Sequence, residues 1–224
     1  MDLIVKICGL STEETLDAAL AAGADMVGFV FFPKSPRFIS IERAAALAKR
    51  VGGRAEVAAL VVDMDDAALA AIVDHVKPDW LQLHGQESVE RTAAIAGRFA
   101  PNVMKAVGVS DTADLALANR YATVADRLLL DAKPPRDAER PGGNARPFDW
   151  HIVTGFAPAV TLMLSGGLTP ANVVEALRIT GAAGVDVSSG VEIAPGKKDP
   201  ALIRQFIANA RSAVGNRVKE KAAS

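Results

Sequence analysis

Residues 22–32 read Ala22-Gly23-Ala24-Asp25-Met26-Val27-Gly28-Phe29-Val30-Phe31-Phe32. From Met26 onward every residue is apolar or glycine, without the alternation that marks a strand with one wet face. Such a run is typical of a strand in a parallel sheet that is covered on both faces. The lead-in recurs in weaker form at Lys77-Pro78-Asp79-Trp80-Leu81 and Ala183-Gly184-Val185-Asp186-Val187, which indicates a repeated helix-to-strand unit.

This run is one of eight apolar runs that alternate with amphipathic segments along the chain. These strand candidates are Leu3–Cys8, Met26–Phe32, Glu56–Val62, Trp80–Leu83, Val103–Val109, Arg127–Asp131, Val160–Leu164 and Gly184–Val187. Dividing 224 residues among eight units gives 28 each, enough for one strand and one helix. Eight such units predict a single-domain (β/α)8 barrel, an α/β fold, with a doubly wound open sheet as the alternative. We expect the domain to span residues 1–214 and residues 215–224 to form a frayed tail.

Helix starts can be located from capping signals. Ser11-Thr12-Glu13-Glu14 has the form of a capping box with Ser11 as the N-cap. Thr169-Pro170 and Asp199-Pro200 each place an N-cap before a proline at the first helical position. The last of these helices would bury Ile203, Phe206, Ile207 and Ala210. The segment Ala132–Pro147 contains four prolines and Gly142-Gly143, which predicts a long mobile loop after the sixth strand.

Composition narrows the class of protein. Half of the residues are hydrophobic and 23% are charged, with a net charge of −1, which gives no support for nucleic-acid binding. The single cysteine excludes an internal disulfide framework and fits a reducing compartment. We see neither a secretory signal nor an apolar stretch of membrane-spanning length, and we expect a cytoplasmic protein.

In a barrel of this kind the active site lies where the strands end. Cys8 ends the first strand, and Asp131 follows three apolar residues at the end of the sixth. Cys8 is either a small buried hydrophobe or a reactive thiol, and Asp131 is either a cap or a catalytic acid or base. Lys6 lies on the same strand face as Cys8, so an inward-pointing ammonium would lower the pKa of the thiol. Together the two residues predict a general base and general acid across the barrel mouth.

Binding residues are expected in the same loops. Gly166 and Gly167 follow the seventh strand, Ser189 and Gly190 follow the eighth, and we expect a short helix after Ser189-Gly190. Their exposed amides predict a phosphate site, although such glycines can also serve only to make tight turns.

Four further polar residues belong to this end of the barrel. Arg37 offers a fork for a carboxylate or phosphate, unless it is merely solvated. His84 shares a face with Gln82 and could line the site with Asp186. Zinc-ligand spacings and nucleotide-binding motifs are absent from the sequence, so we predict neither a metal nor a cofactor.

The chain resembles the phosphoribosylanthranilate isomerase family of tryptophan biosynthesis. The resemblance covers essentially the whole chain, in order. Its motifs are Lys6-Ile7-Cys8-Gly9, Gly28–Phe31, Ser35–Ser40, Leu81–Gly85, Lys105–Val107, Leu130-Asp131, Phe148-Asp149-Trp150, Leu164–Leu168, Asp186–Glu192 and Pro195–Asp199.

This resemblance implies a cofactor-free Amadori rearrangement of N-(5-phosphoribosyl)anthranilate. The product would be 1-(2-carboxyphenylamino)-1-deoxyribulose 5-phosphate. Cys8 matches the general base of the family, Asp131 its general acid, and Arg37 the residue that holds the anthranilate carboxylate. Gly166, Gly167, Ser189 and Gly190 match its phosphate loops. The sequence leaves open whether the protein is a monomer or a homodimer.

One position departs from the family pattern, and two other readings remain. Where the family has a third glycine, this chain has Ala145, and alanine resists the positive φ that glycine allows. A histidine-pathway or dual-substrate phosphosugar isomerase shares the phosphate loops, but such barrels carry an aspartate where this chain has Cys8. A non-catalytic phosphosugar-binding barrel would not need both Cys8 and Asp131.

Overall fold

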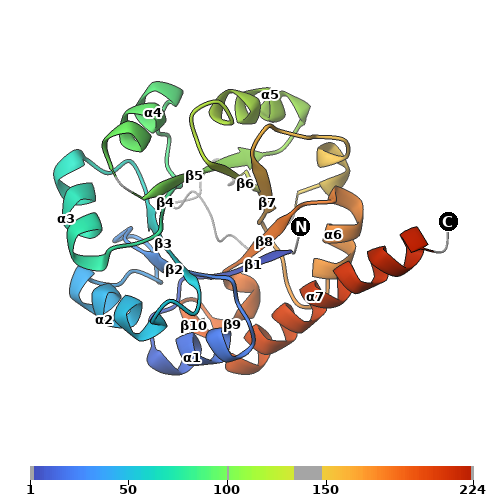
Figure 1. Cartoon of the computed structure of the whole chain (residues 1–224), viewed down its shortest axis with the longest axis horizontal. Helices are drawn as coiled ribbons and strands as arrows, with labels where there is room; N and C mark the ends of the chain where they lie inside the picture. Colours follow the sequence, from blue (N-terminus) through green and yellow to red (C-terminus); the bar gives the residue numbers. More distant parts are fainter. Residues whose placement is uncertain (1–2, 100, 134–147, 223–224) are drawn as a thin grey trace.

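The computed structural model describes residues 3–99, 101–133 and 148–222. Eight parallel strands form a closed barrel, with helices around its outside (Figure 1). The strands are β1 (Ile4–Cys8), β2 (Met26–Val30), β3 (Glu56–Val61), β4 (Trp80–Leu83), β5 (Asn102–Val109), β6 (Arg127–Ala132), β7 (Thr161–Leu164) and β8 (Gly184–Val187). The α-helices are α1 (Glu13–Ala21), α2 (Ile41–Val51), α3 (Asp66–Val76), α4 (Val89–Arg98), α5 (Thr112–Tyr121), α6 (Val173–Thr180) and α7 (Pro200–Ala222).

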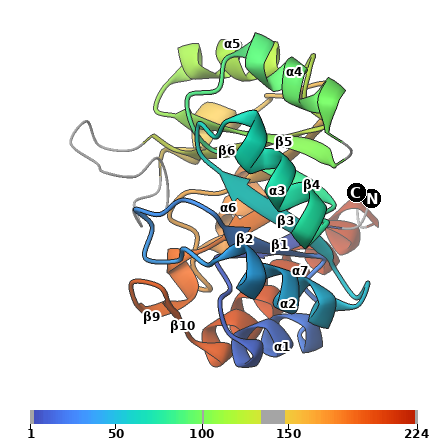
Figure 2. The same ribbon diagram turned by 90° about the vertical axis from the view of Figure 1, so that its left-hand side faces the viewer.

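The predicted barrel is confirmed, because β1 pairs with β8 as well as with β2. Every strand of the barrel therefore has a neighbour on both sides, whereas an open sheet has two edge strands. Each predicted apolar run forms a strand whose ends differ from the prediction by no more than two residues. The side view separates the strand ends that carry the hairpin of β9 (Glu192–Ala194) and β10 (Lys197–Lys198) from the opposite end of the barrel (Figure 2).

The connection between β6 and β7 departs from the expected strand-and-helix unit. In the described part of this connection the only helix is the 3₁₀ helix η1 (Trp150–Val153). Most of the predicted loop, residues 134–147 with Ala145, lies outside the described residues. At the C-terminus α7 continues to Ala222, past the expected boundary at residue 214, and fraying of that end stays a prediction.

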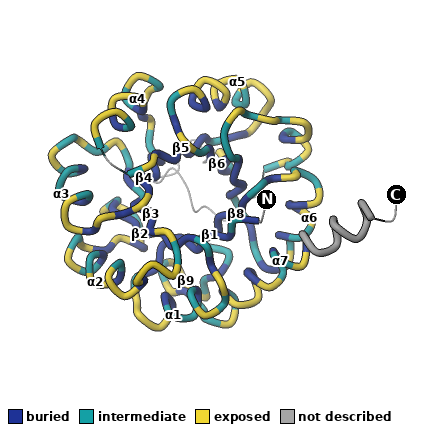
Figure 3. Tube along the Cα trace, viewed as in Figure 1, coloured by how far each residue is buried: buried dark blue, intermediate teal, exposed yellow. Residues whose placement is uncertain are grey.

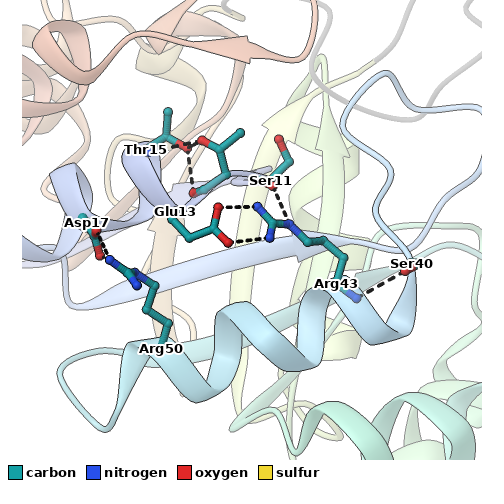
Figure 4. Close-up of polar contacts among 8 residues, drawn as sticks. Ser11, Glu13, Thr15, Asp17, Ser40, Arg43 and Arg50 are labelled. Carbon is teal, nitrogen blue, oxygen red and sulfur yellow. Dashed lines mark hydrogen bonds and ion pairs between the residues drawn. The ribbon is translucent and has the colours of Figure 1, made fainter.

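Two of the three predicted helix starts are wrong, by one residue for α1 and by three residues for α6. The N-cap of α1 is Thr12, whose side chain accepts a hydrogen bond from the amide of Thr15, whereas the carbonyl of Ser11 accepts one from Arg43 (Figure 4). The N-cap of α6 is Asn172, because the chain first makes a turn in which the Thr169 amide donates to the Asn172 side chain. The predicted start at Asp199-Pro200 is confirmed, and its apolar face is buried.

Exposed ion pairs join the first two helices on the outside of the barrel. Arg43 and Arg50 of α2 reach Glu13 and Asp17 of α1, respectively (Figure 4). All four side chains are well exposed to solvent, so these pairs contribute little to stability. The packing of α1 and α2 onto the barrel depends instead on buried residues such as Leu16 and Leu47.

The apolar core has two layers, because successive side chains of a strand point alternately into the barrel and toward the helices. The strands form a buried ring, while exposed residues lie on the outer helices (Figure 3). The inner layer is formed by Met26, Ala58, Trp80, Met104, Ala106, Leu129 and Met163. Farther along the strands, polar residues are buried, and the paired Lys6 and Asp186 are among them. The inside of the barrel therefore changes from apolar to charged toward the C-terminal ends of its strands.

Aspartates join neighbouring strands at the N-terminal ends of the strands. Asp25, Asp79 and Asp126 each precede an even-numbered strand and accept a hydrogen bond from an amide of the preceding odd-numbered strand, at 2.6, 2.7 and 2.8 Å. This contact gives the repeat of residues 22–27 and 77–81 its physical meaning. The match to residues 183–187 is out of register, since Asp186 lies within β8 and pairs with Lys6.

Candidate active site

A cavity of about 640 Å³, counted with the open solvent at its mouth, lies at the C-terminal ends of the strands. Eight of the nine predicted site residues line it: Cys8, Arg37, His84, Asp131, Gly166, Gly167, Asp186 and Ser189. Gly190 lies behind the wall, where a side chain would overlap the carbonyl oxygen of Leu168. Gly190 thus lets the loops after β7 and β8 pack backbone against backbone.

Cys8 ends β1 and is almost fully buried in the cavity wall. Gly28 on the adjacent strand makes room for it, because a Cβ there would lie 2.9 Å from the sulfur and 3.0 Å from Lys6 Nζ. Burial raises the pKa of the Cys8 thiol above its usual value, since a thiolate is poorly solvated there. The Lys6 ammonium acts in the opposite direction, as expected, but does not outweigh burial.

Lys6 is itself paired with a carboxylate. Its Nζ donates to Asp186 Oδ1 at 2.9 Å, and both side chains are buried. Although burial works against its charge, Asp186 and Cys8 together hold the pKa of Lys6 above its usual value. Lys6 therefore remains an ammonium beneath the thiol. Asp186 offsets part of that positive charge, which limits what Lys6 can do for a thiolate.

Asp131 is the last residue of β6 that points into the barrel, and β6 lies across the barrel from β1. One of its carboxyl oxygens lies 3.0 Å from His84 Nε2, and the other accepts a hydrogen bond from the amide of Ala132 at 2.8 Å. Gln82 contacts the far side of the His84 ring, at 3.1 Å from Nδ1. The carboxyl group is therefore held in a fixed orientation at the cavity wall.

Arg37 is buried rather than solvated, with 6% of its surface exposed. Its Nε and Nη2 donate to the two carboxylate oxygens of Glu192 at 2.6 and 2.8 Å. Lys198 Nζ donates to the same carboxylate at 2.6 Å and to the backbone oxygen of Ser188 at 3.0 Å. Sequence reasoning assigned no role to Glu192 or Lys198. The one signal was the turn Pro195-Gly196 between them, which is typical of a hairpin.

The phosphate-binding prediction rests on two loops that face the same space. Gly166 and Gly167 after β7 and Ser189 after β8 all line the cavity. A short helix is present, but the 3₁₀ helix η2 (Ser189–Val191) begins at Ser189 itself rather than after Gly190, as was expected. Backbone amides of such turns suit an anion.

Lys105 lies in the middle of β5 and does not line the cavity. It points outward from β5 and donates to Glu87 at 2.8 Å, beside the ring of Tyr121. Side-chain alternation, which the sequence leaves ambiguous in a run as apolar as β5, decides this placement. Lys105 and Glu87 form a separate buried pair that is not part of the cavity.

Within residues 3–99, 101–133 and 148–213, whose side chains the structure describes, no group of three histidine, cysteine, aspartate or glutamate residues is arranged to hold a metal ion. In the same part of the chain, no helix combines the length and apolar character needed to cross a membrane.

Known proteins are similar to this chain in both sequence and architecture. A model of the family described as N-(5'phosphoribosyl)anthranilate (PRA) isomerase matches residues 5–209. An N-(5'-phosphoribosyl)anthranilate isomerase of Rhodopseudomonas palustris (strain HaA2) is 58% identical over 212 residues, covering 95% of this chain and 97% of the relative.

Solved structures agree with this. The phosphoribosyl anthranilate isomerase of Thermotoga maritima has a TM-score of 0.85 and 38% identity, covering 94% of this chain and 99% of its own. A phosphoribosyl anthranilate isomerase solved in complex with reduced 1-(o-carboxyphenylamino)-1-deoxyribulose 5-phosphate has a TM-score of 0.81 and 36% identity, with the same coverage. By fold, by the residues that line the cavity and by these matches, the chain belongs to the N-(5'-phosphoribosyl)anthranilate isomerase family.

Proposed function

We propose that this chain converts N-(5'-phosphoribosyl)anthranilate to 1-(2-carboxyphenylamino)-1-deoxyribulose 5-phosphate in tryptophan biosynthesis, with Cys8 as general base and Asp131 as general acid. The roles proposed for Cys8 and Asp131 rest on one observation. Cys8 and Asp131 line a single cavity from opposite sides of the barrel, together with an arginine and two glycine-rich loops.

The acid acts first. Protonated Asp131 gives its proton to the ring oxygen of the ribose, and the C1–O bond breaks as the nitrogen lone pair forms a cationic iminium. The contacts of Asp131 with His84 and Ala132 orient its carboxyl group, so little reorganisation is needed at the moment of transfer.

The base then removes the C2 proton. The Cys8 thiolate takes that proton, and the C2–H electrons form the enolamine while the iminium is neutralised. Tautomerisation to the ketone completes the rearrangement. Because burial raises its pKa, most of the thiol is protonated at neutral pH before the substrate binds. A cationic iminium beside the sulfur favours the thiolate, so the intermediate itself prepares the base.

The two ends of the substrate are held by different groups. Arg37 binds the anthranilate carboxylate, and Gly166, Gly167 and Ser189 bind the phosphate, with Gly190 supporting the loops. We propose that His84 and Asp186 contribute to the wall between them. The substrate thus spans the cavity with its reacting carbons between Cys8 and Asp131.

Purified protein and the fluorescence decay of N-(5'-phosphoribosyl)anthranilate test this proposal directly. Cys8→Ala and Asp131→Asn should each lower kcat by roughly two orders of magnitude or more, which is what one general base or acid contributes. Binding of reduced 1-(o-carboxyphenylamino)-1-deoxyribulose 5-phosphate should persist in both. Near wild-type turnover in either variant would contradict its assigned role.

The same preparation separates the alternatives. Turnover of the histidine-pathway aminoaldose as well would indicate a dual-substrate enzyme, which the thiol at position 8 disfavours. Binding without isomerisation of either substrate would indicate a non-catalytic barrel. We further propose a cytoplasmic protein that is a monomer or a homodimer and uses no cofactor. Sedimentation velocity determines its oligomeric state.

A further inference from the structure

Three charged side chains lie buried beside the cavity, and the mechanism above uses only one of them. Arg37, Glu192 and Lys198 expose 6%, 4% and 1% of their side chains. Of the three, only Arg37 reaches the cavity wall. Burying Glu192 and Lys198 is costly unless they are paired, so their contacts indicate what they do.

Glu192 holds one edge of the Arg37 guanidinium. Its two oxygens accept from Nε and Nη2 in the bidentate geometry that is strong and directional. A guanidinium has five N–H groups in a rigid plane. With the Nε edge occupied, the edge formed by Nη1 and the second N–H of Nη2 has no hydrogen bond to any residue that the structure describes, and it suits another carboxylate. Rotation about the end of the arginine side chain is also prevented.

Lys198 supplies a second positive charge behind this pair. Without it, Arg37 would stand between two carboxylates, that of Glu192 and that of the substrate. Lys198 Nζ donates to Glu192 at 2.6 Å and to both oxygens of Ser188. Although burial acts in the opposite direction, Arg37 and Lys198 keep the pKa of Glu192 below its usual value. Burial lowers the pKa of Lys198, and the Glu192 carboxylate acts in the opposite direction. With Lys198 protonated, the three groups carry one net positive charge, which a bound carboxylate neutralises.

The supporting residues come from a hairpin that joins the two ends of the cavity. Glu192 begins β9 and Lys198 ends β10, and the amide of Gly196 in the turn donates to Glu192 at 3.2 Å. Ser188, which Lys198 contacts, precedes the predicted phosphate residue Ser189 and donates to the carbonyl of Cys8 at 3.1 Å. The hairpin thus fixes Arg37 relative to both the phosphate loop and the base.

We infer that Glu192 is a positioning residue, balanced by Lys198, which turns the free Nη1/Nη2 edge of Arg37 toward the cavity so that it receives the aromatic carboxylate of the ligand. This inference rests on the proposed function. It assigns carboxylate recognition to a triad of which only Arg37 touches the ligand.

The test compares two ligands that differ only in that carboxylate. They are reduced 1-(o-carboxyphenylamino)-1-deoxyribulose 5-phosphate and the same compound without the ring carboxylate, with both affinities measured by calorimetry. We define the ratio as the dissociation constant of the compound without the carboxylate divided by that of the compound with it. This ratio reports on carboxylate recognition alone. In wild type we expect the carboxylate to improve affinity by at least about tenfold, as expected for charge-assisted hydrogen bonds.

Glu192→Gln distinguishes positioning from simple charge. Removing a negative charge would by itself strengthen the binding of an anion, and so would raise the ratio. Loss of the grip on Arg37 should instead lower it, toward the value in Arg37→Met. Glu192→Asp keeps the charge but shortens the side chain, and it should lower the ratio as well. Lys198→Met should do the same by removing the balancing charge.

Two control variants show whether a change in the ratio comes from the contact between Glu192 and Arg37. Glu87→Gln breaks another buried glutamate–lysine pair and should leave the ratio unchanged, whatever it does to stability. Adding Glu192→Gln to Arg37→Met should not lower the ratio any further, because Glu192 positions the ligand only through Arg37.

An unchanged or increased ratio in folded Glu192→Gln and Glu192→Asp would overturn the inference. A wild-type protein that binds both ligands equally would do so too, while leaving the acid–base roles intact. Failure of the wild type to turn over its substrate would count against the proposed function instead.

Discussion

Cys8 is the only cysteine in the chain, so every thiol measurement reports on it alone. Burial raises its pKa, and Lys6 is the nearest group acting in the other direction. A buried base with a raised pKa is mostly protonated at neutral pH and gains thiolate as the pH rises. We therefore expect kcat/KM to increase from neutral toward alkaline pH.

Replacing Lys6 tests this balance. In Lys6→Met the ammonium is lost and Asp186 is left unpaired, and both changes disfavour the thiolate. The thiolate titration, followed by ultraviolet absorbance, should therefore move to higher pH than in wild type, together with the alkaline rise in kcat/KM. Lys6→Met with Asp186→Asn controls for the orphaned carboxylate. A titration that stays in place, or moves to lower pH, would show that Lys6 does not act on Cys8.

At the N-terminal ends of the strands, aspartates join neighbouring strands by hydrogen bonds, and the cavity lies at the C-terminal ends. In Asp79→Ala the amide of Val57 loses its acceptor, which should lower the free energy of unfolding by about 1–2 kcal/mol in urea. Turnover at a permissive temperature should persist, since this contact lies far from the cavity. Asp79→Asn keeps an oxygen acceptor and should fall in between. Lost activity with full stability would contradict this division of the barrel.

Helix ends were the elements least accessible to sequence reasoning. Ser11 and Thr12 offer nearly the same capping chemistry, and the side chain of Arg43 from the next helix contacts the Ser11 carbonyl. At Thr169 a turn closed by Asn172 precedes the helix. Such choices between neighbouring residues depend on contacts from other elements.

The barrel as a whole forms the cavity, because the cavity is lined by strand ends from around the barrel. A ligand that binds only this folded arrangement stabilises it. At about one hundred times its dissociation constant, the reduced product analogue should add about 2.7 kcal/mol. For a chain of this size that corresponds to a rise in Tm of about 5–10 °C by calorimetry. Arg37→Met should show a smaller rise at the same concentration, and an unchanged Tm in wild type would argue against binding in this cavity.

The sequence by itself determined the eight strands, the barrel and the family, and it brought eight of nine predicted residues to one cavity. It could do so because apolar runs, their spacing and local motifs are properties of neighbouring residues. Only the tertiary structure decided that Lys6 faces Asp186 across 180 positions of sequence and that Arg37 meets Glu192 across 155. Those contacts exist because closing the barrel brings β8 and its hairpin against β1 and β2. No local pattern encodes which charges then meet in the interior.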